Sequence, residues 1–200
     1  MSPRPYDRTL RLAAAGEARR RIAEAAAALH AKRGALGTTH AMIARDAGVS
    51  LPTVYKYFPR RNDLIPACTG LIAGRAPVAL DGRIFDGRSD VPGRVRALAR
   101  ALFRLHEHFA PWLRWSDTDA AALPALREFL ERGRRGRREL LRRALTPPGS
   151  RPPADSLVLP AHVLLEYPSW KVLSAGGRSS DRAAALAADS VLKLCKTRFS

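Results

Sequence analysis

The sequence Ala47-Gly48-Val49-Ser50 separates two short helical patterns, and it constrains the fold more than any other stretch of the chain. The glycine follows the first pattern, where a helix ends and a positive φ angle costs glycine little. The serine precedes the second pattern, where its hydroxyl can accept a hydrogen bond from an unpaired backbone N–H. Pro52 is compatible with the start of a helix, because first-turn N–H groups have no helical partner. Two short helices joined in this way form a helix-turn-helix.

The two helices of this motif differ in what they expose. The first begins at Thr38 or Thr39, either of which can cap it. The second, Leu51–Phe58, places Val54 and Phe58 four residues apart and therefore on the same, inward face. Its other faces carry threonine, lysine and tyrosine side chains, which can contact phosphates. We therefore expect Leu51–Phe58 to be a recognition helix.

Helical patterns continue through the rest of the chain, and no stretch alternates in the way of a strand, so the predicted fold class is all-α. A stripe of Ile22, Ala25, Ala26 and Leu29 marks a helix before the motif. The segment Arg75–Pro92, rich in Gly, Asp and Pro, predicts a connection between domains. The further predicted helices are one starting at Asn62 or Asp63, Val91–Phe109, Asp119–Leu145, Leu157–Ala175 with interruptions at Pro160 and Pro168, and one capped by Ser180 or Asp181 that ends near Arg198.

The charge balance points to a polyanionic partner. The chain has 35 Lys and Arg against 18 Asp and Glu, a formal net charge of +17. The abundance of arginine and alanine also fits the codon bias of a GC-rich genome, so the charge supports nucleic-acid binding without proving it. Cys68 and Cys195 are too few and too far apart for a disulfide framework or a zinc site, and are expected to be buried free thiols. No apolar run is long enough to span a membrane and the N-terminus lacks a signal core, so we expect a cytoplasmic protein without a membrane partner.

The sequence carries no signal for catalysis. Asp117 and Asp119 lie at a predicted helix start, where acidic residues are common. His106 and His108 are two residues apart and would point away from each other on a helix, which disfavours a metal site. No nucleophile elbow, phosphate loop or dinucleotide fingerprint is present. We therefore expect no enzyme activity, no catalytic residue, no metal and no cofactor.

The stretch AGVSLPTVYKYFPRRNDL, with the preceding Thr-headed helix and Ile43-Ala44, resembles the TetR family of bacterial transcription regulators. The resemblance covers residues 17–72 well and the rest only in outline. It implies three parts: residues 1–16 as a basic N-terminal arm, residues 17–74 as a three-helix helix-turn-helix DNA-binding domain, and residues 75–200 as a helical ligand-binding and dimerisation domain. The last two helices of the family typically form the interface of a homodimer.

The resemblance also implies roles for single residues. Thr53 and Tyr55 match positions that typically bind phosphates, Tyr57 matches one that faces DNA, and Thr39 and Arg61 match further phosphate ligands. Physical reasoning adds Leu51, Pro52 and Lys56 as candidates for base contacts, because a recognition helix presents its N-terminal residues to base edges. The expected DNA-contacting residues are Thr38, Thr39, Leu51, Pro52, Thr53, Tyr55, Lys56, Tyr57 and Arg61.

Two of these assignments have an ordinary alternative, in which Tyr55 and Tyr57 are amphipathic surface residues. Arg60 and Pro66 depart from the family pattern at the start of the fourth helix, the one thought to transmit ligand binding.

Aromatic and histidine side chains gather in the stretch Phe103–Trp115 of an otherwise aromatic-poor chain and suggest an effector pocket, although plain core packing explains Phe103 and Phe109 at least equally well. The candidate pocket residues are Phe103, His106, Phe109, Trp112, Trp115, Phe129, His162 and Trp170. The function that follows is a homodimeric repressor that binds a palindromic double-stranded DNA operator and is released by a small-molecule effector. The alternatives are a transcriptional activator and a basic protein that binds DNA without sequence preference.

Overall fold

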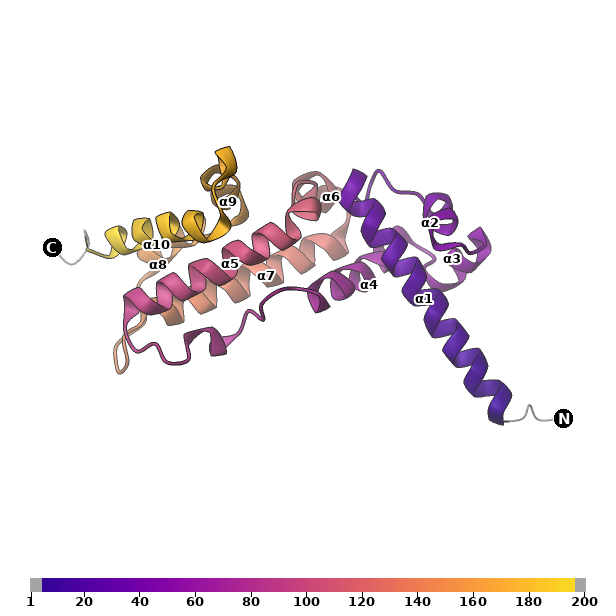
Figure 1. Ribbon diagram of the computed structural model, residues 1–200, viewed down its shortest axis with the longest axis horizontal. Coiled ribbons are helices and arrows are strands. Elements are labelled where there is room, and N and C mark those ends of the chain that lie inside the picture. Colours follow the sequence, from indigo (N-terminus) through magenta and orange to yellow (C-terminus); the bar gives the residue numbers. More distant parts are fainter. Residues whose placement is uncertain (1–4, 197–200) are drawn as a thin grey trace. The chain divides into compact units, whose positions relative to one another are not determined.

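The computed structural model describes residues 5–196, and within this range the chain is all-α, with no strand. The predicted fold class is confirmed. The chain divides into two compact units (Figure 1). Unit 1 holds residues 1–75 together with 114–128, and unit 2 holds residues 76–113 together with 129–200. This division differs from the expected boundary after residue 74, because the segment 114–128 groups with the N-terminal helices.

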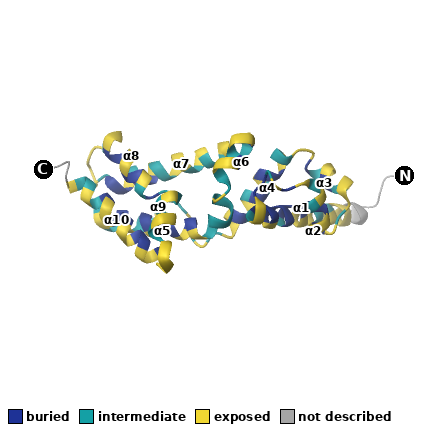
Figure 2. Ribbon diagram, turned by 90° about the horizontal axis from the view of Figure 1, so that it is seen from above, coloured by how far each residue is buried: buried dark blue, intermediate teal, exposed yellow. Residues whose placement is uncertain are grey.

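Unit 1 is built on α1 (Pro5–Arg33), which packs against α2 (His40–Ala47) and α4 (Arg61–Gly74), while α2 packs against α3 (Leu51–Tyr57). The apolar stripe predicted on the first helix is confirmed as core. Removing these side chains from water stabilises the unit by roughly 1.5–3 kcal/mol for each large aliphatic or aromatic residue. The buried residues of these helices include Ile22, Ala25, Ala26, Leu29, Ile43, Ala44, Val54, Phe58, Leu64, Ile65 and Ile72 (Figure 2).

Most of the predicted N-terminal arm is helical. Helix α1 starts at Pro5, so residues 5–16 continue the first helix, and the remaining residues 1–4 lie outside the described range. Proline is favourable in the first turn of a helix, and the alanine-rich run that follows has high helix propensity. Gly16 does not interrupt it.

Unit 1 also contains α6 (Ser116–Ala122) and the start of α7 (Pro124–Leu145). A single helix over Asp119–Leu145 was predicted, and this is wrong. Leu123 breaks it with an extended conformation, φ −118° and ψ 95°, because the residue before a proline is disfavoured in the α region. The side chain of Leu123 is buried in a small cluster with Ala35 and Ile65.

Unit 2 contains α5 (Val91–Leu113), α8 (Asp155–Leu164), α9 (Tyr167–Leu173), α10 (Ser180–Lys196) and most of α7. Two short 3-10 turns, η1 (Gly82–Phe85) and η2 (Ala175–Gly177), complete it. Helix α10 packs against α5, α8 and α9, and η1 packs against α5. The core includes Val95, Leu98, Leu102, Phe103, Leu141, Val158, Leu165, Ala184 and Val191.

Several helix ends in unit 2 differ from the predictions. Helix α5 runs on through Pro111, and the break between α8 and α9 falls at Leu165–Glu166 rather than at Pro160, which lies inside α8. The last helix is capped by Ser179, whose hydroxyl accepts a hydrogen bond from the Arg182 N–H at 3.4 Å, instead of by Ser180 or Asp181. Its expected end near Arg198 lies outside the described residues.

The two cysteines are free, as predicted. Cys68 is buried, its thiol donates to the Leu64 carbonyl, and burial raises its pKa to about 12. Cys195 is only half-buried. No helix in residues 5–196 combines the length and the apolar character needed to cross a membrane.

Candidate nucleic-acid interface

The turn between α2 and α3 has the geometry that its glycine predicts. Gly48 adopts φ 62° and ψ 40°, in the left-handed region that favours glycine. The backbone N–H of Val49 donates to the Ala44 carbonyl at 3.0 Å, and that of Gly48 to the Arg45 carbonyl at 3.2 Å. These bonds satisfy carbonyls at the end of α2 that have no helical partner. The chain reverses within a few residues, and α3 can start at once.

Side-chain caps fix the starts of both helices of the motif. The Thr39 hydroxyl accepts the Met42 N–H at 3.2 Å, which decides between the two predicted caps of α2. The Ser50 hydroxyl accepts the Thr53 N–H at 3.3 Å and shares a second hydrogen bond with the Thr53 hydroxyl at 2.7 Å. Each cap of this kind contributes roughly 0.5–2 kcal/mol. The two caps therefore fix the residues at which α2 and α3 begin.

Two buried apolar side chains anchor helix α3 to the core of unit 1. Val54 is fully buried and Phe58 is almost fully buried. The helix ends at Tyr57, so Phe58 is its C-cap and not its last residue. The backbone N–H of Phe58 donates to the Val54 carbonyl at 2.8 Å. The opposite face of the helix is thereby directed outward.

Most of the predicted DNA-contacting side chains are accessible. Leu51 and Tyr55 are 38% and 49% exposed, high values for large apolar or aromatic side chains. The ammonium of Lys56 lies 5.6 Å from the centre of the Tyr57 ring. In the predicted set, Thr39, Leu51, Pro52, Tyr55 and Lys56 are exposed, and Thr53, Tyr57 and Arg61 are half-buried.

Thr38 is an exception. Its side chain is buried, and its hydroxyl donates to the Gly34 carbonyl at 2.8 Å, so it is unavailable to DNA. The physical reason is the tight turn that ends α1, which the threonine hydroxyl closes. We remove Thr38 from the predicted contacts.

Two basic side chains of α1 contact the helix-turn-helix motif. The Arg21 guanidinium donates to the Gly48 carbonyl at 3.4 Å, in the turn itself. The Arg19 guanidinium lies 5.6 Å from the centre of the Phe58 ring. Positive charge of the first helix therefore lies at both ends of α3.

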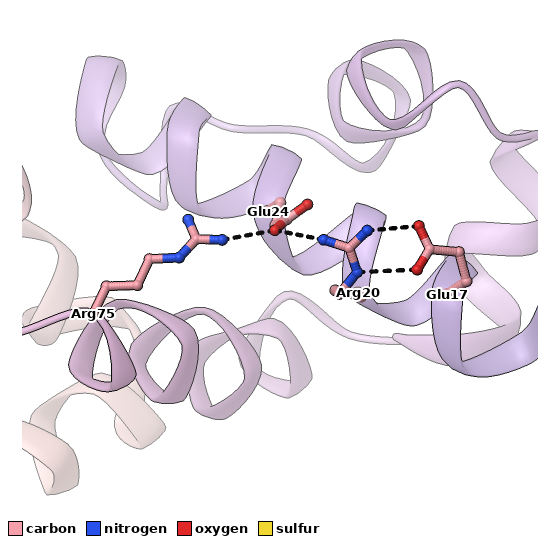
Figure 3. A network of polar contacts seen from close by, with 4 residues as sticks. All are labelled: Glu17, Arg20, Glu24 and Arg75. Atoms are coloured by element: carbon pink, nitrogen blue, oxygen red, sulfur yellow. Dashed lines mark hydrogen bonds and ion pairs between the residues drawn. The ribbon is translucent and has the colours of Figure 1, made fainter. Parts of the chain in front are cut away.

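Further along α1, Glu24 accepts from both Arg20, at 2.9 Å, and Arg75, at 2.7 Å, and Glu17 pairs with the other side of Arg20 (Figure 3). Glu24 is half-buried and its partners are exposed, so the network orders side chains more than it stabilises the fold.

His40 is a residue of this region that sequence reasoning missed. It is the first residue of α2, and its ring stacks on that of Tyr55 with centroids 4.7 Å apart and an interplanar angle of 3°. Its Nε2 lies 2.9 Å from the Phe58 carbonyl oxygen. The sequence offers no more signal than a histidine next to a capping threonine.

Asp119 was also missed, because sequence alone interprets it as an acidic residue near a helix start. It is buried, and its carboxylate accepts the backbone N–H of Ala35 at 2.6 Å and of Leu36 at 3.1 Å. Gly34, with φ 75°, lies so close that a Cβ there would be 3.0 Å from the Asp119 carboxylate. This turn is a backbone nest occupied by a carboxylate.

The eight candidate pocket residues fall into different environments. Trp115 lies in unit 1, where its indole N–H donates to the Ala31 carbonyl at 3.3 Å, while the other seven lie in unit 2. Phe103 is fully buried in the core, as the packing alternative predicts. His106 is buried with its Nε2 2.9 Å from the Leu165 carbonyl oxygen, and Phe109, Trp112 and Phe129 are half-buried.

His162 and Trp170 lie in a polar and aromatic cluster of unit 2. The Trp170 ring stacks on Tyr167 with centroids 5.4 Å apart, and its N–H donates to the Ser180 hydroxyl at 3.1 Å. His162 is buried 3.5 Å from the Glu166 carboxylate, which holds the Arg137 guanidinium through bonds of 2.6 and 2.7 Å. Burial lowers the pKa of His162, and the neighbouring Glu166 carboxylate opposes this shift.

A capped two-helix motif on a three-helix core, with an exposed second helix of aromatic and basic side chains, defines a helix-turn-helix DNA-binding protein. Residues 22–68 match the model of the bacterial regulatory proteins of the tetR family. Residues 22–68 thus form a TetR-type helix-turn-helix domain, which lies in unit 1.

Solved structures share this fold. A protein described as a transcriptional regulator from Streptomyces coelicolor A3(2) is 22% identical, with a TM-score of 0.64 over 89% of this chain and 98% of its own. One described as a TetR-family transcriptional regulator from Rhodococcus sp. is 19% identical, with a TM-score of 0.61 over 90% of this chain and 98% of its own. No curated protein matches the chain.

Proposed function

We propose that the protein is a homodimeric, ligand-responsive transcriptional repressor that binds a palindromic operator and is released by a small-molecule effector. The observation that carries the proposal is the exposed face of α3, rigidly capped at Ser50 and anchored by Val54 and Phe58, within a TetR-type domain. A helix of this kind fits the major groove of B-DNA, where each base pair presents a distinct pattern.

The accessible side chains divide into two groups by chemistry. Hydroxyl and guanidinium groups suit phosphates, and in this set they are Thr39, Thr53, Tyr55, Tyr57 and Arg61. Leu51, Pro52 and Lys56 suit base edges: the first two make apolar contacts, for example to a thymine methyl, and the lysine reaches guanine acceptors. Because most of these groups contact phosphate, sequence specificity rests on few residues.

The dimer would use an apolar surface of unit 2. Leu159 and Val163 are exposed four residues apart on α8, and Leu186 is exposed on α10. Val163 is 64% exposed. In a two-fold dimer such a surface meets its own copy. The two recognition helices would then read half-sites about 10 bp, or a multiple of that, apart.

The effector would bind in unit 2, whose buried histidines, aromatic rings and Arg137–Glu166 pair offer both apolar and polar contacts. The response has a physical route in the chain itself. Helix α6 connects α5 to α7 and is bonded to the turn after α1 through Asp119. An effector that favours another arrangement of α5 and α7 would act on the DNA-binding unit through this helix, with a coupling of roughly 1–3 kcal/mol.

The test begins with duplexes selected from a random library by the wild-type protein. Binding of the selected duplex is measured by fluorescence anisotropy for Lys56→Ala and Tyr55→Phe, with Lys171→Ala in unit 2 as a control that removes equal charge. We expect the first two to weaken binding by roughly 1–3 kcal/mol each and the control to bind as wild type. Unchanged affinity in both α3 variants would show that the DNA-binding face lies elsewhere.

A ratio of specific to non-specific affinity near one at fixed salt would identify a non-specific DNA-binding protein instead. A promoter reporter carrying the selected duplex then separates repression from activation.

A further inference from the structure

One imidazole ring of α2 contacts the recognition helix at two points. The His40 ring is nearly parallel to that of Tyr55, at 3°, with centroids 4.7 Å apart. The same ring places Nε2 2.9 Å from the carbonyl oxygen of Phe58, three residues further along. A single side chain therefore spans the last turn of α3 from the first residue of α2.

The hydrogen bond determines which ring nitrogen carries a proton. A carbonyl oxygen only accepts, so His40 Nε2 must donate. Phe58 is the C-cap of α3, and its carbonyl is among those at a helix end without an intrahelical partner. His40 therefore satisfies the end of the recognition helix while its ring faces Tyr55.

The core anchors of α3 are other side chains. Val54 and Phe58 already anchor α3 with side chains that are almost fully buried. His40 is only half-buried, and its ring partner, Tyr55, is 49% exposed. What the stacking restricts is the orientation of an exposed aromatic side chain on the DNA-facing side of the motif.

We propose that His40 is a positioning residue for DNA recognition, which holds the Tyr55 ring and the last turn of α3 in the orientation that binds a backbone phosphate. This rests on the proposed role of Tyr55 as a phosphate ligand. A side chain that is already ordered loses less conformational freedom on binding, so the gain appears as affinity. Thr39, which precedes His40 and caps α2, places a second phosphate-binding hydroxyl next to this residue in the chain.

Three variants separate the two contacts of the ring. His40→Ala removes both, His40→Phe keeps an aromatic ring for stacking, and His40→Gln keeps a donor near the position of Nε2. With the duplex selected by the wild-type protein, we expect His40→Ala to weaken binding about 3- to 10-fold, the range for one hydrogen bond or one ordered side chain. His40→Phe should recover most of this loss, because stacking is what orients Tyr55.

A double-mutant cycle with Tyr55→Phe identifies the positioning role. This substitution removes only the hydroxyl that would bind phosphate. We expect its effect on affinity to be at least about 3-fold smaller in the His40→Ala background, since a misplaced hydroxyl contributes less. Lys56→Ala serves as the control, because the described residues show no hydrogen bond or ring interaction between Lys56 and His40. Its effect should be the same in both backgrounds.

Additive effects of His40→Ala and Tyr55→Phe, each alone weakening binding, would overturn the positioning role and identify His40 as an independent DNA contact. An equal reduction of the Tyr55 and Lys56 effects, with a lowered melting temperature, would overturn it in favour of a structural role. Both outcomes leave the proposed DNA-binding face intact. That face fails on different evidence, namely wild-type affinity in Tyr55→Phe and Lys56→Ala alike.

Discussion

The Asp119 carboxylate accepts the backbone N–H of Ala35 at 2.6 Å, across 84 residues of sequence. The same carboxylate accepts the Leu36 N–H at 3.1 Å, and the left-handed Gly34 allows the close approach. A buried carboxylate is stable only when it is hydrogen-bonded, and a turn with two free N–H groups supplies that environment. This pair of bonds joins α6 to the end of α1.

Replacing Asp119 should therefore destabilise unit 1. We expect Asp119→Ala to lower the free energy of unfolding by roughly 1.5–3 kcal/mol, the range for hydrogen bonds to a charged group whose buried donor is left unpaired. Urea denaturation gives the global effect, and amide hydrogen exchange should become faster at Ala35 and Leu36. Asp117→Ala, at an exposed position in the same helix, is the control. Unchanged exchange at Ala35 would contradict the assigned bond.

Two glycines should respond to alanine in opposite ways. Gly48 has φ 62°, and a Cβ added there would meet open space, so Gly48→Ala meets only backbone strain, roughly 1–2 kcal/mol of destabilisation. Gly70 lies inside α4 without a positive φ, and a methyl group added there would meet open space, so Gly70→Ala should stabilise by up to about 1 kcal/mol. Chemical denaturation of both variants measures the change in the free energy of unfolding. Changes of the same sign in the two variants would refute the conformational argument.

The stability of the protein should fall in mild acid because of His106. Burial lowers the pKa of this histidine to about 4, with the Leu165 carbonyl and Glu166 opposing the shift. The unfolded state, with an ordinary pKa near 6.5, takes up the proton first as pH falls. The contribution of neutral His106 to the free energy of unfolding is roughly 3 kcal/mol. It is complete above pH 6.5 and decreases between pH 6.5 and about 4.

The measurement is the free energy of urea unfolding at several pH values between 4 and 8, compared between wild type and His106→Gln. Glutamine keeps a donor for the Leu165 carbonyl but does not titrate. We expect a shallower pH dependence in the variant, with the remaining slope arising in part from His30, whose pKa burial also lowers to about 4. Identical slopes would exclude His106 as a source.

Dimerisation should depend on Val163. This residue and Leu12 of α1 are both 64% exposed, but only Val163 lies on the proposed interface of unit 2. We expect Val163→Asp to weaken the dimer by roughly 3 kcal/mol, on the order of 100-fold, because an unpaired charge would be buried. Analytical ultracentrifugation measures the dissociation constant. Leu12→Asp, which changes an equally exposed residue, should leave it unchanged, and an equal effect of both variants would argue against this interface.

Some features were predictable because they depend on neighbours along the chain. The left-handed Gly48, the Ser50 cap and the inward Val54 and Phe58 follow from residue chemistry at fixed spacing. The break at Leu123 also depends on a neighbour, because Pro124 disfavours a helical conformation of the residue before it. This break was missed because the apolar residues continue at helical spacing through it.

Other features depend on contacts that no local pattern records. Thr38 and Thr39 are adjacent in sequence, yet one hydroxyl is buried against Gly34 and the other caps α2. Trp115, expected with the effector pocket, donates to the Ala31 carbonyl in unit 1. The sequence by itself determined the all-α fold class, the Ser50 cap and the helix-turn-helix, because these arise from interactions within a few residues. Only the tertiary structure placed His40 on Tyr55 and Asp119 in the turn after α1, because packing brings together groups that are distant in the chain.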